Sequence, residues 1–558
     1  MKKTNKLLVM FMVSMLTLSF FVGFTNPVIE AKAATVSVSQ KYADAMEPGW
    51  NLGNTFDSFD TNGDKGENSW GNPNVTRDLI KTIKAQGFNS IRMPFTALMR
   101  TGSAPDYKID PNFLARYAEV VKWALDENLY VMINLHHDSW NWVKEIDSDD
   151  CEAMQRYKAI WVQLADYFKD YSDKVCFESL NEPQFASGDQ AAKIKILEKV
   201  NIQFYNIVRN SGGNNATRML VLPTLNTNDS QDRCESLYKT IVELNDPNIM
   251  VTFHYYGFWP FSVNVAGCTT MNSDVTADLE NSFMRMSNNF TSKGIGVICG
   301  EYGLLGFDNG MTAIEHGEEL KYFEYLMSFA KSKNISMMLW DNGQHMGRTS
   351  LTWSDPLLYN IIKSSFTSRS SYTQSDRIFI NDENKKEDVS MDMTLNGNTL
   401  EGIYDGSKQL VAGKDYVCDN YKVTLNGKYI NSVIKSDYGV NATLTMKFSA
   451  GADWNVYIDH YEKPVLGTGQ MVGNNFEIPV QFNGSRLLTL EAVYSNGTGA
   501  GPNNWTTYKE YNNVYAPDYT SNKVIIKDKF FAEAKAGKIT FKLHFQSGEI
   551  LQSSIMLS

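Results

Sequence analysis

The sequence predicts an α/β protein, a (β/α)8 TIM barrel followed by two small all-β sandwich domains. The barrel is indicated by apolar, strand-like runs that alternate with amphipathic helical patterns from Trp50 to about Phe366. The sandwiches are indicated by a change after residue 370, where short alternating runs separated by Gly, Asn and Asp replace the helical periods. A chain of 558 residues also exceeds what one hydrophobic core usually holds.

Each barrel element is expected at a definite place. The strands are expected at 49–52, 90–94, 130–135, 175–180, 219–222, 250–254, 296–299 and 336–340. The helices are expected near 76–86, 112–127, 152–170, 190–210, 231–244, 274–292, 313–332 and 356–365. A doubly wound open sheet is the alternative, but it would place its site at one switch point. Polar or aromatic residues follow nearly every strand here, as the C-terminal face of a barrel requires.

The N-terminus has the pattern of a signal peptide. Lys2, Lys3 and Lys6 precede an apolar run from Leu7 to about Phe24, and Ala31-Lys32-Ala33 follows as a cleavage pattern. A membrane anchor is the alternative, but no basic stop-transfer flank follows the apolar run. We expect a secreted, extracellular protein without a membrane partner once the signal is removed. The expected domains are a signal peptide at 1–33, the barrel at 36–370, an immunoglobulin-like sandwich at 371–462 and a second sandwich at 463–558.

Composition narrows the class of partner. The net charge of −11 argues against nucleic acid and anionic membranes, and fits a neutral polymer as well as it fits mere solubility. Six scattered cysteines predict no disulfide framework, although one bridge stays open. Neither C-x-x-C nor H-E-x-x-H occurs, so no metal site or cofactor is predicted, and we expect a monomer.

Two glutamates at strand ends suggest the chemistry. The run 175–184, VCFESLNEPQ, is a buried strand that delivers Glu182 and is stopped by Pro183. The run 296–303, GVICGEYG, delivers Glu301 in the same way. Glycosidic bond cleavage needs two such carboxylates, one as acid and one as nucleophile or base.

Other strand-end residues complete a candidate substrate site. They are Asn51, Asn54, Arg92, His136, His137, Asn181, His254, Tyr256 and Trp340. Taken alone, each of these residues has a structural explanation. The arginine could be a structural ion-pair partner, a histidine could be a hydrogen-bonded structural group, and the tryptophan could belong to the hydrophobic core. Packing explains their joint placement on one face far less easily.

Physical chemistry then suggests individual roles. Arg92 is the natural cation for a nucleophilic Glu301, and Tyr256 is a hydrogen-bond donor to the same carboxylate. Asn181 can bond a sugar hydroxyl, and Trp340 offers an apolar face under the ring that is cleaved. Three further residues are expected to line the outer cleft: Trp259, Trp140 and Trp142.

The motifs WNLGNTFD, GFNSIRMPF, INLHHD, SLNEP, HYYGFW, GEYG and LWDNG together resemble glycoside hydrolase family 5, and most closely its fourth subfamily. The resemblance spans about residues 45–368. It implies a retaining mechanism with Glu182 as acid/base and Glu301 as nucleophile. It also implies site positions for Arg92, His136, Asn181, His254, Tyr256 and Trp340, and leaves open which of His136 and His137 faces the sugar.

The two sandwiches also resemble known modules. NGNTLEGIYDGSKQLVAGKDY and FSAGADW are similar to the immunoglobulin-like X2 modules of secreted cellulases. The last block resembles carbohydrate-binding module family 46, with Trp505 in a Gly/Asn-rich loop as the candidate sugar-stacking residue. This module could anchor the enzyme to fibre or complete the cleft, and the short junctions favour completion.

The prediction is therefore a secreted endo-β-1,4-glucanase acting on cellulose, mixed-linkage β-glucan and xyloglucan. One alternative is a non-catalytic polysaccharide-binding barrel, although binding alone needs neither an acid nor a nucleophile. The other is the same mechanism directed at xylan or mannan, because loop shape decides among these polymers.

Overall fold

The computed structural model describes residues 36–62, 66–305 and 312–558. The predicted signal peptide lies outside these residues. The described residues from Ser37 to Ser558 form one compact unit. Among the described residues, no helix is both long and apolar enough to span a membrane.

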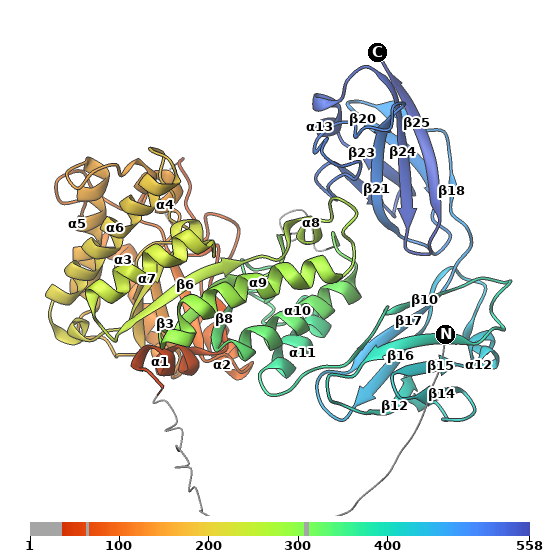
Figure 1. The fold of residues 1–558 in the computed structure, drawn as a ribbon, viewed down its shortest axis with the longest axis horizontal. Coiled ribbons are helices and arrows are strands. Elements are labelled where there is room, and N and C mark those ends of the chain that lie inside the picture. The colour runs from red at the N-terminus through yellow and green to blue at the C-terminus, as the bar shows by residue number, and fades with distance from the viewer. Residues whose placement is uncertain (1–35, 63–65, 306–311) are drawn as a thin grey trace, which may run out of the picture. The chain divides into compact units, whose positions relative to one another are not determined.

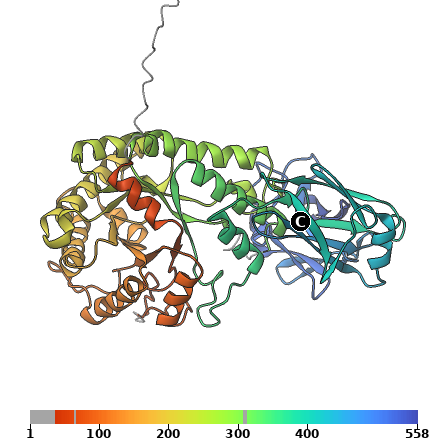
Figure 2. The same cartoon turned by 90° about the horizontal axis from the view of Figure 1, so that it is seen from below.

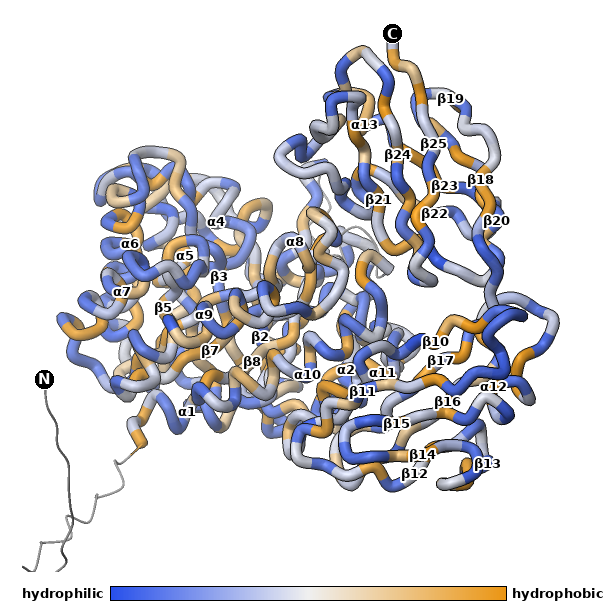
Figure 3. Tube along the Cα trace, turned by 45° about the vertical axis from the view of Figure 1, so that its right-hand side comes forward, coloured by the Kyte–Doolittle hydropathy of each residue, from blue (hydrophilic) through white to orange (hydrophobic). Residues whose placement is uncertain are grey.

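Eight parallel strands close into a barrel and confirm the predicted fold class (Figure 1). They are β1 (Gly49–Asn51), β2 (Ser90–Phe95), β3 (Tyr130–Leu135), β4 (Val175–Glu178), β5 (Leu220–Pro223), β6 (Ile249–Tyr255), β7 (Val297–Tyr302) and β8 (Ile335–Leu339). Every residue of these strands is buried except Tyr130 and His254, which are partly exposed. The barrel strands are therefore rich in hydrophobic residues, coloured orange in Figure 3.

One helix follows each strand and packs around the barrel (Figure 2). These helices are α2 (Arg77–Ala85), α3 (Pro111–Asp126), α5 (Glu152–Phe168), α6 (Gln190–Asn210), α7 (Gln231–Leu244), α9 (Ser273–Asn289), α10 (His316–Ser332) and α11 (Pro356–Ser365). Several of these helices begin with a capping residue. The carboxylates of Asp110 and Asp355 each accept two backbone N–H groups, and a proline follows each of them as the first residue of the helix.

An additional helix, α1 (Val38–Met46), was not predicted and covers the N-terminal end of the barrel. Its Ala43 and Met46 join a buried cluster with inward residues of the strands, among them Met132, Met250 and Met338. This end of a barrel serves stability, so the site must lie at the other.

Two antiparallel modules follow the barrel. The middle one contains β9 (Tyr372–Thr373), β10 (Arg377–Ile380), β11 (Val389–Thr394), β12 (Leu400–Asp405), β13 (Lys408–Gln409), β14 (Tyr416–Asp419), β15 (Lys422–Leu425), α12 (Gly427–Val433), β16 (Gly439–Phe448) and β17 (Trp454–His460). Its sheets have the orders β10-β17-β16-β12-β13 and β14-β15-β11-β9.

The last module contains β18 (Val465–Leu466), β19 (Gln470–Val472), β20 (Asn475–Gln481), β21 (Leu487–Tyr494), β22 (Tyr515–Asp518), β23 (Lys523–Ile526), α13 (Asp528–Glu533), β24 (Gly537–Phe545) and β25 (Ile550–Leu557). Its sheets have the orders β18-β20-β23-β22, with β19 paired to β20, and β21-β24-β25.

One local prediction was wrong. The first sandwich was expected to consist of strands and turns, but residues 427–433 form α12. The Asn426 side chain accepts the N–H of Lys428 and so caps a helix instead of turning a hairpin. α13 likewise interrupts a stretch that was expected to be β-structure.

Candidate active site

The geometry of β7 explains how Glu301 reaches the site. The β6–β7 pairing runs Phe253 to Cys299 and then His254 to Glu301, so Gly300 is an extra residue in the ladder. Such a bulge re-aims the side chain that follows it. A Cβ at Gly300 would lie 2.6 Å from Thr252 Oγ1, so only glycine fits.

Glu301 is buried, with 6% of its side chain exposed, and each of its oxygens has a donor. Arg92 Nη1 donates to Oε1 at 2.6 Å, and Tyr256 donates its hydroxyl to Oε2 at 2.7 Å. Burial and the charge of Glu301 raise the pKa of Tyr256 well above its usual value, so the phenol keeps its proton. The carboxylate therefore has a cation at one oxygen and a hydrogen-bond donor at the other.

Glu182 lies beyond β4 with the positive φ of 37°. A non-glycine residue in this region is strained, and such strain is typical of functional sites. Its side chain is 42% exposed, and its Oε1 contacts His254 Nδ1 at 3.0 Å. Burial would raise its pKa, but the hydrogen bond and charge of His254 outweigh burial and leave the pKa below its usual value.

The two carboxylates lie close together. One oxygen of Glu182, one of Glu301 and a ring nitrogen of His254 all lie within 4.8 Å of one another. An approach of two oxygens this close agrees with the roughly 5–5.5 Å separation of the carboxyl groups in retaining glycosidases.

Arg92 is fully buried and connects several of these residues. Its Nε and Nη2 both bond to Glu178, at 2.6 and 3.1 Å, and Nη2 also bonds to Asn181 Oδ1 at 2.8 Å. Nη1 bonds to Asn51 Oδ1 as well as to Glu301. The guanidinium is thus held in one orientation by two carboxylates and two amides.

Sequence reasoning missed Glu178. It is the last residue of β4 and is completely buried. The available signal was a charged residue inside an otherwise apolar strand, since a carboxylate rarely occupies such a position without a partner.

Asn51 lies deeper than predicted. Its Nδ2 donates to the backbone oxygens of Gly300 and Leu339, and its Oδ1 accepts from Arg92. Both side-chain groups are used within the protein, so Asn51 positions Arg92, and its direct contact with substrate stays a prediction.

The two adjacent histidines have different surroundings. His136 stacks parallel to Trp340, with ring centroids 5.7 Å apart, and its Nδ1 contacts the Asn134 amide at 3.0 Å. Because this amide nitrogen only donates, the His136 proton is on Nε2, which lies 4.0 Å from Glu301. Burial, then the neighbouring His137, Arg92 and His254, lower the pKa of His136 well below its usual value, so the ring is neutral.

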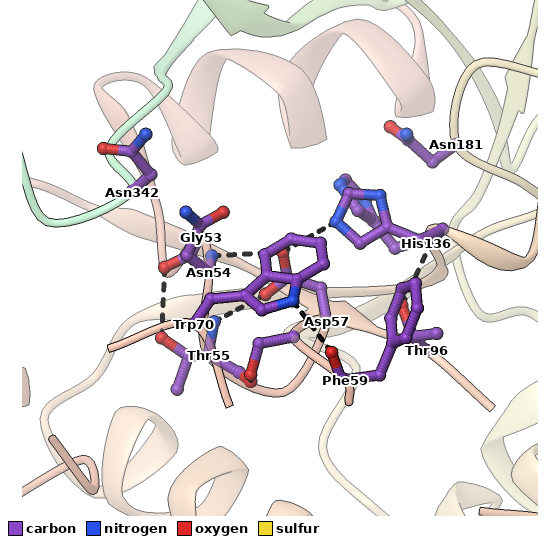
Figure 4. A network of polar contacts seen from close by, with 12 residues as sticks. Gly53, Asn54, Thr55, Asp57, Phe59, Trp70, Thr96, His136, Asn181 and Asn342 are labelled. Carbon is purple, nitrogen blue, oxygen red and sulfur yellow. Dashed lines mark hydrogen bonds and ion pairs between the residues drawn. The ribbon is translucent and has the colours of Figure 1, made fainter. Parts of the chain in front are cut away.

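Both nitrogens of His137 are occupied. Nε2 contacts Asp57 at 3.1 Å (Figure 4), and Nδ1 accepts the indole N–H of Trp140 at 3.0 Å. Of the two histidines, His136 is therefore the one that presents a ring nitrogen toward Glu301.

The three tryptophans predicted to line the outer cleft differ in exposure: Trp140 and Trp259 are exposed, and Trp142 is partly buried. Trp259 and Trp505 are exposed, and their ring centroids lie 6.2 Å apart. Trp142 instead donates its N–H to buried Asp138, and Arg156 covers its ring, so it supports a loop.

A barrel with a closely spaced carboxylate pair on its C-terminal face defines a retaining glycoside hydrolase. The family model described as cellulase (glycosyl hydrolase family 5) matches residues 52–346. Models described as carbohydrate binding domain X2 and carbohydrate binding domain (CBM46) match residues 372–458 and 462–558. The chain belongs to glycosyl hydrolase family 5.

Similar proteins share the whole arrangement. Endoglucanase B of Paenibacillus lautus is 46% identical over 530 residues, covering 94% of this chain and 93% of that protein. A tri-modular endo-β-1,4-glucanase B structure from Bacillus halodurans is 42% identical, with a TM-score of 0.90 and coverage of 93% and 97%. A tri-modular family 5 (subfamily 4) enzyme from Bacillus licheniformis, complexed with cellotetraose, is 29% identical, with a TM-score of 0.81 and coverage of 93% and 99%.

Proposed function

We propose that this family 5 endoglucanase is secreted and cleaves β-1,4-glucosidic bonds by a double displacement, with Glu301 as nucleophile and Glu182 as acid/base. The observation that carries the assignment is the asymmetry of the pair. Glu301 is buried between Arg92 and Tyr256, whereas the Glu182 side chain is 42% exposed.

In the first step, a Glu301 oxygen attacks the anomeric carbon, and Glu182 gives its proton to the departing glycosidic oxygen. A sugar over Glu182 excludes water from its carboxyl group and so raises its pKa, the direction that an acid catalyst requires. In the second step, ionised Glu182 takes a proton from water, whose oxygen attacks the same carbon and releases Glu301.

Replacing Glu301 by Gln tests the assignment. The amide keeps the size of the side chain but cannot form the glycosyl ester, so turnover of mixed-linkage β-glucan should fall by about five orders of magnitude or more. Binding of cellotetraose, measured by calorimetry, should persist. Normal turnover in this variant would contradict the proposal.

We further propose that the last module completes the cleft and that xyloglucan is a substrate. The rings of Trp259 and Trp505 belong to two different domains, and their centroids lie only 6.2 Å apart. Asn264 is 3% exposed and bonds twice to the last module. Its Nδ2 donates to the backbone oxygen of Leu488 at 2.9 Å, and its backbone oxygen accepts the N–H of Tyr511. These bonds fix the two domains, and with them the two rings, relative to each other.

Initial rates on soluble carboxymethyl-cellulose, mixed-linkage glucan, xyloglucan, xylan and mannan test the substrate. We expect fast cleavage of the glucose-backbone polymers with xyloglucan among the best. Activity confined to xylan or mannan would keep the mechanism and refute the substrate.

Trp505→Ala separates the two roles of the last module. If the module completes the cleft, kcat/KM on soluble xyloglucan falls, by about tenfold for a lost aromatic contact. A module that only anchors to fibre would change rates on insoluble cellulose alone, which would refute completion.

A further inference from the structure

The loop that carries Trp505 surrounds one buried lysine. Residues 502–506 contain no helix or strand, so their carbonyl oxygens do not pair as they would in a regular element. The Lys509 side chain is fully buried. Its Nζ donates to the backbone oxygens of Pro502 at 2.8 Å and Thr506 at 3.1 Å, and lies 3.5 Å from that of Asn503. One ammonium group thus gathers three carbonyls of the same loop.

An ammonium group suits this arrangement. It has three N–H donors and no acceptor, so it can satisfy three oxygens that converge on one point. Converging carbonyls would otherwise repel one another, and a buried carbonyl without a donor is costly. Without the ammonium group, the loop would have to turn these carbonyls toward water, and Trp505 would move with them.

The two ends of this loop are held by β21. The N–H of Ala500 donates to Ala492 O and the N–H of Lys509 donates to Leu490 O, each at 2.9 Å. Between these ends Trp505 is 61% exposed, so its own ring cannot fix the path of the chain. The contacts of the Lys509 side chain therefore set the shape of residues 502–506.

This part of the last module contacts the barrel segment that follows β6. The rings of Trp505 and Trp259 lie 6.2 Å apart. A Cβ added at Gly267 would lie 2.9 Å from the ring of Tyr508, so the barrel backbone leaves room for that ring. Because both contacts come from residues 505–508, a change in the path of the loop would separate the aromatic pair.

We infer that Lys509 is a positioning residue for the cleft, because its ammonium group holds residues 502–506 in the shape that places Trp505 beside Trp259. This rests on the proposed completion of the cleft by the last module. Lys509 is fully buried, so it acts on the substrate only through Trp505.

The ammonium group titrates in an accessible range. Burial lowers the pKa of Lys509 to about 8, and the negative charge of Glu533 on α13 opposes this shift. Residues 502–506 carry no ionisable side chain, and Glu491 of β21 is bonded to Lys542 and His544. The neutral amine keeps two N–H groups and gains a lone pair that repels carbonyl oxygens. The loop should therefore loosen as pH rises through about 8.

Turnover of soluble xyloglucan by Lys509→Met, with and without Trp505→Ala, tests the positioning role. Met keeps an unbranched side chain but supplies no donor. Lys509→Met alone should lower kcat/KM by about tenfold, as Trp505→Ala does. In the Trp505→Ala background it should lower kcat/KM no further, because both changes remove the same contact. Its effect on the melting temperature should be the same in both backgrounds, which separates positioning from stability.

Lys523→Met is the matched control. Lys523 forms an ion pair with Glu477 on another sheet of the same module, at 3.0 Å. Its replacement should leave kcat/KM on xyloglucan unchanged.

A second measurement needs no substitution at Lys509. The ratio of kcat/KM between the unsubstituted chain and Trp505→Ala, taken at each pH, cancels the titration of the catalytic residues, because both chains contain them. This ratio should be about ten near pH 6 and should approach one above about pH 9. Burial also raises the pKa of Asp376 to about 8, so the decline must persist when Asp376→Asn is introduced into both chains.

The inference is overturned if the losses of Lys509→Met and Trp505→Ala add, or if the ratio is constant between pH 6 and 9. Full activity of Lys509→Met beside a weakened Trp505→Ala would refute the inference and keep the completed cleft. Unchanged kcat/KM in Trp505→Ala would refute the completed cleft and the inference together.

Discussion

Glu182 and Glu301 are chemically identical, and their surroundings make them different. Glu301 receives a cation and a phenol, whereas Glu182 is strained, partly exposed and bonded to His254. Their positions at strand ends could be predicted from the sequence. Arg92 and Tyr256 could also be predicted as partners of Glu301. Glu178, which orients Arg92, could not, because its role depends on a contact between residues far apart in the chain.

A variant of His254 tests whether this residue controls the pKa of Glu182. Its hydrogen bond lowers the pKa of Glu182, so His254→Phe should raise that pKa. An acid catalyst loses activity as pH rises through its pKa, so the alkaline limb of the kcat/KM profile should move to higher pH while kcat falls. The His544→Gln variant, in the last module, is the control. An unmoved limb in His254→Phe would show that His254 does not control Glu182.

Strand β7 illustrates that the position of a strand can be predicted from the sequence, whereas an irregularity in its pairing cannot. Apolar runs and amphipathic periods located all eight strands and their helices within a few residues, because the period of a pattern is a local property. The bulge at Gly300 is invisible in the sequence, since it depends on the register with β6. Helix α12 was missed because Asn-Gly serves a helix start as well as a turn.

Two glycines next to or within β7 give a matched pair of variants. A Cβ at Gly300 would meet Thr252 and His254 near the catalytic end, and one at Gly296 would lie 2.4 Å from Ser39 O, under α1. Each alanine should cost about 1–3 kcal/mol of stability. Only Gly300→Ala should also lower kcat, because it displaces Glu301.

Melting temperature and kcat should be measured for both alanine variants. Gly102→Ala, where the added Cβ meets nothing closer than 3.8 Å, should change neither. A normal kcat in Gly300→Ala would mean that the bulge does not aim the nucleophile.

At the scale of the whole molecule, the barrel and the middle module share one buried apolar cluster that runs from Trp50 to Ile458. Polar contacts cross the same boundary. Asp376, 3% exposed, packs against Gly317 at the start of α10 and faces Glu315 of the barrel. Arg377 bonds to Asp459 within the module and lies 3.9 Å from Glu315. The sequence predicted a short junction but not this acidic contact.

This junction should make stability depend on pH. Burial and the charge of Glu315 raise the pKa of Asp376 to about 8. Between about pH 4 and 8, the folded state therefore holds a proton that the unfolded chain has released. The free energy of unfolding is unaffected by this group below about pH 4 and falls as pH rises toward 8. Asp376→Asn should melt at a higher temperature than the unsubstituted chain at pH 8, and the difference should shrink at pH 4. Parallel melting curves at both pH values would contradict this.

Covalent catalysis by Glu301 is the central step of the proposed mechanism. An activated 2-deoxy-2-fluoro-β-cellobioside should glycosylate the nucleophile quickly, with loss of its leaving group, and the glycosyl ester should hydrolyse slowly. The fluorine destabilises both transition states, while the leaving group accelerates only the first step. Mass spectrometry of the digested protein should place one added cellobiosyl group on the peptide that contains Glu301, and on no other. A label on Glu182, or turnover with inversion and no label, would contradict the assignment of nucleophile and acid.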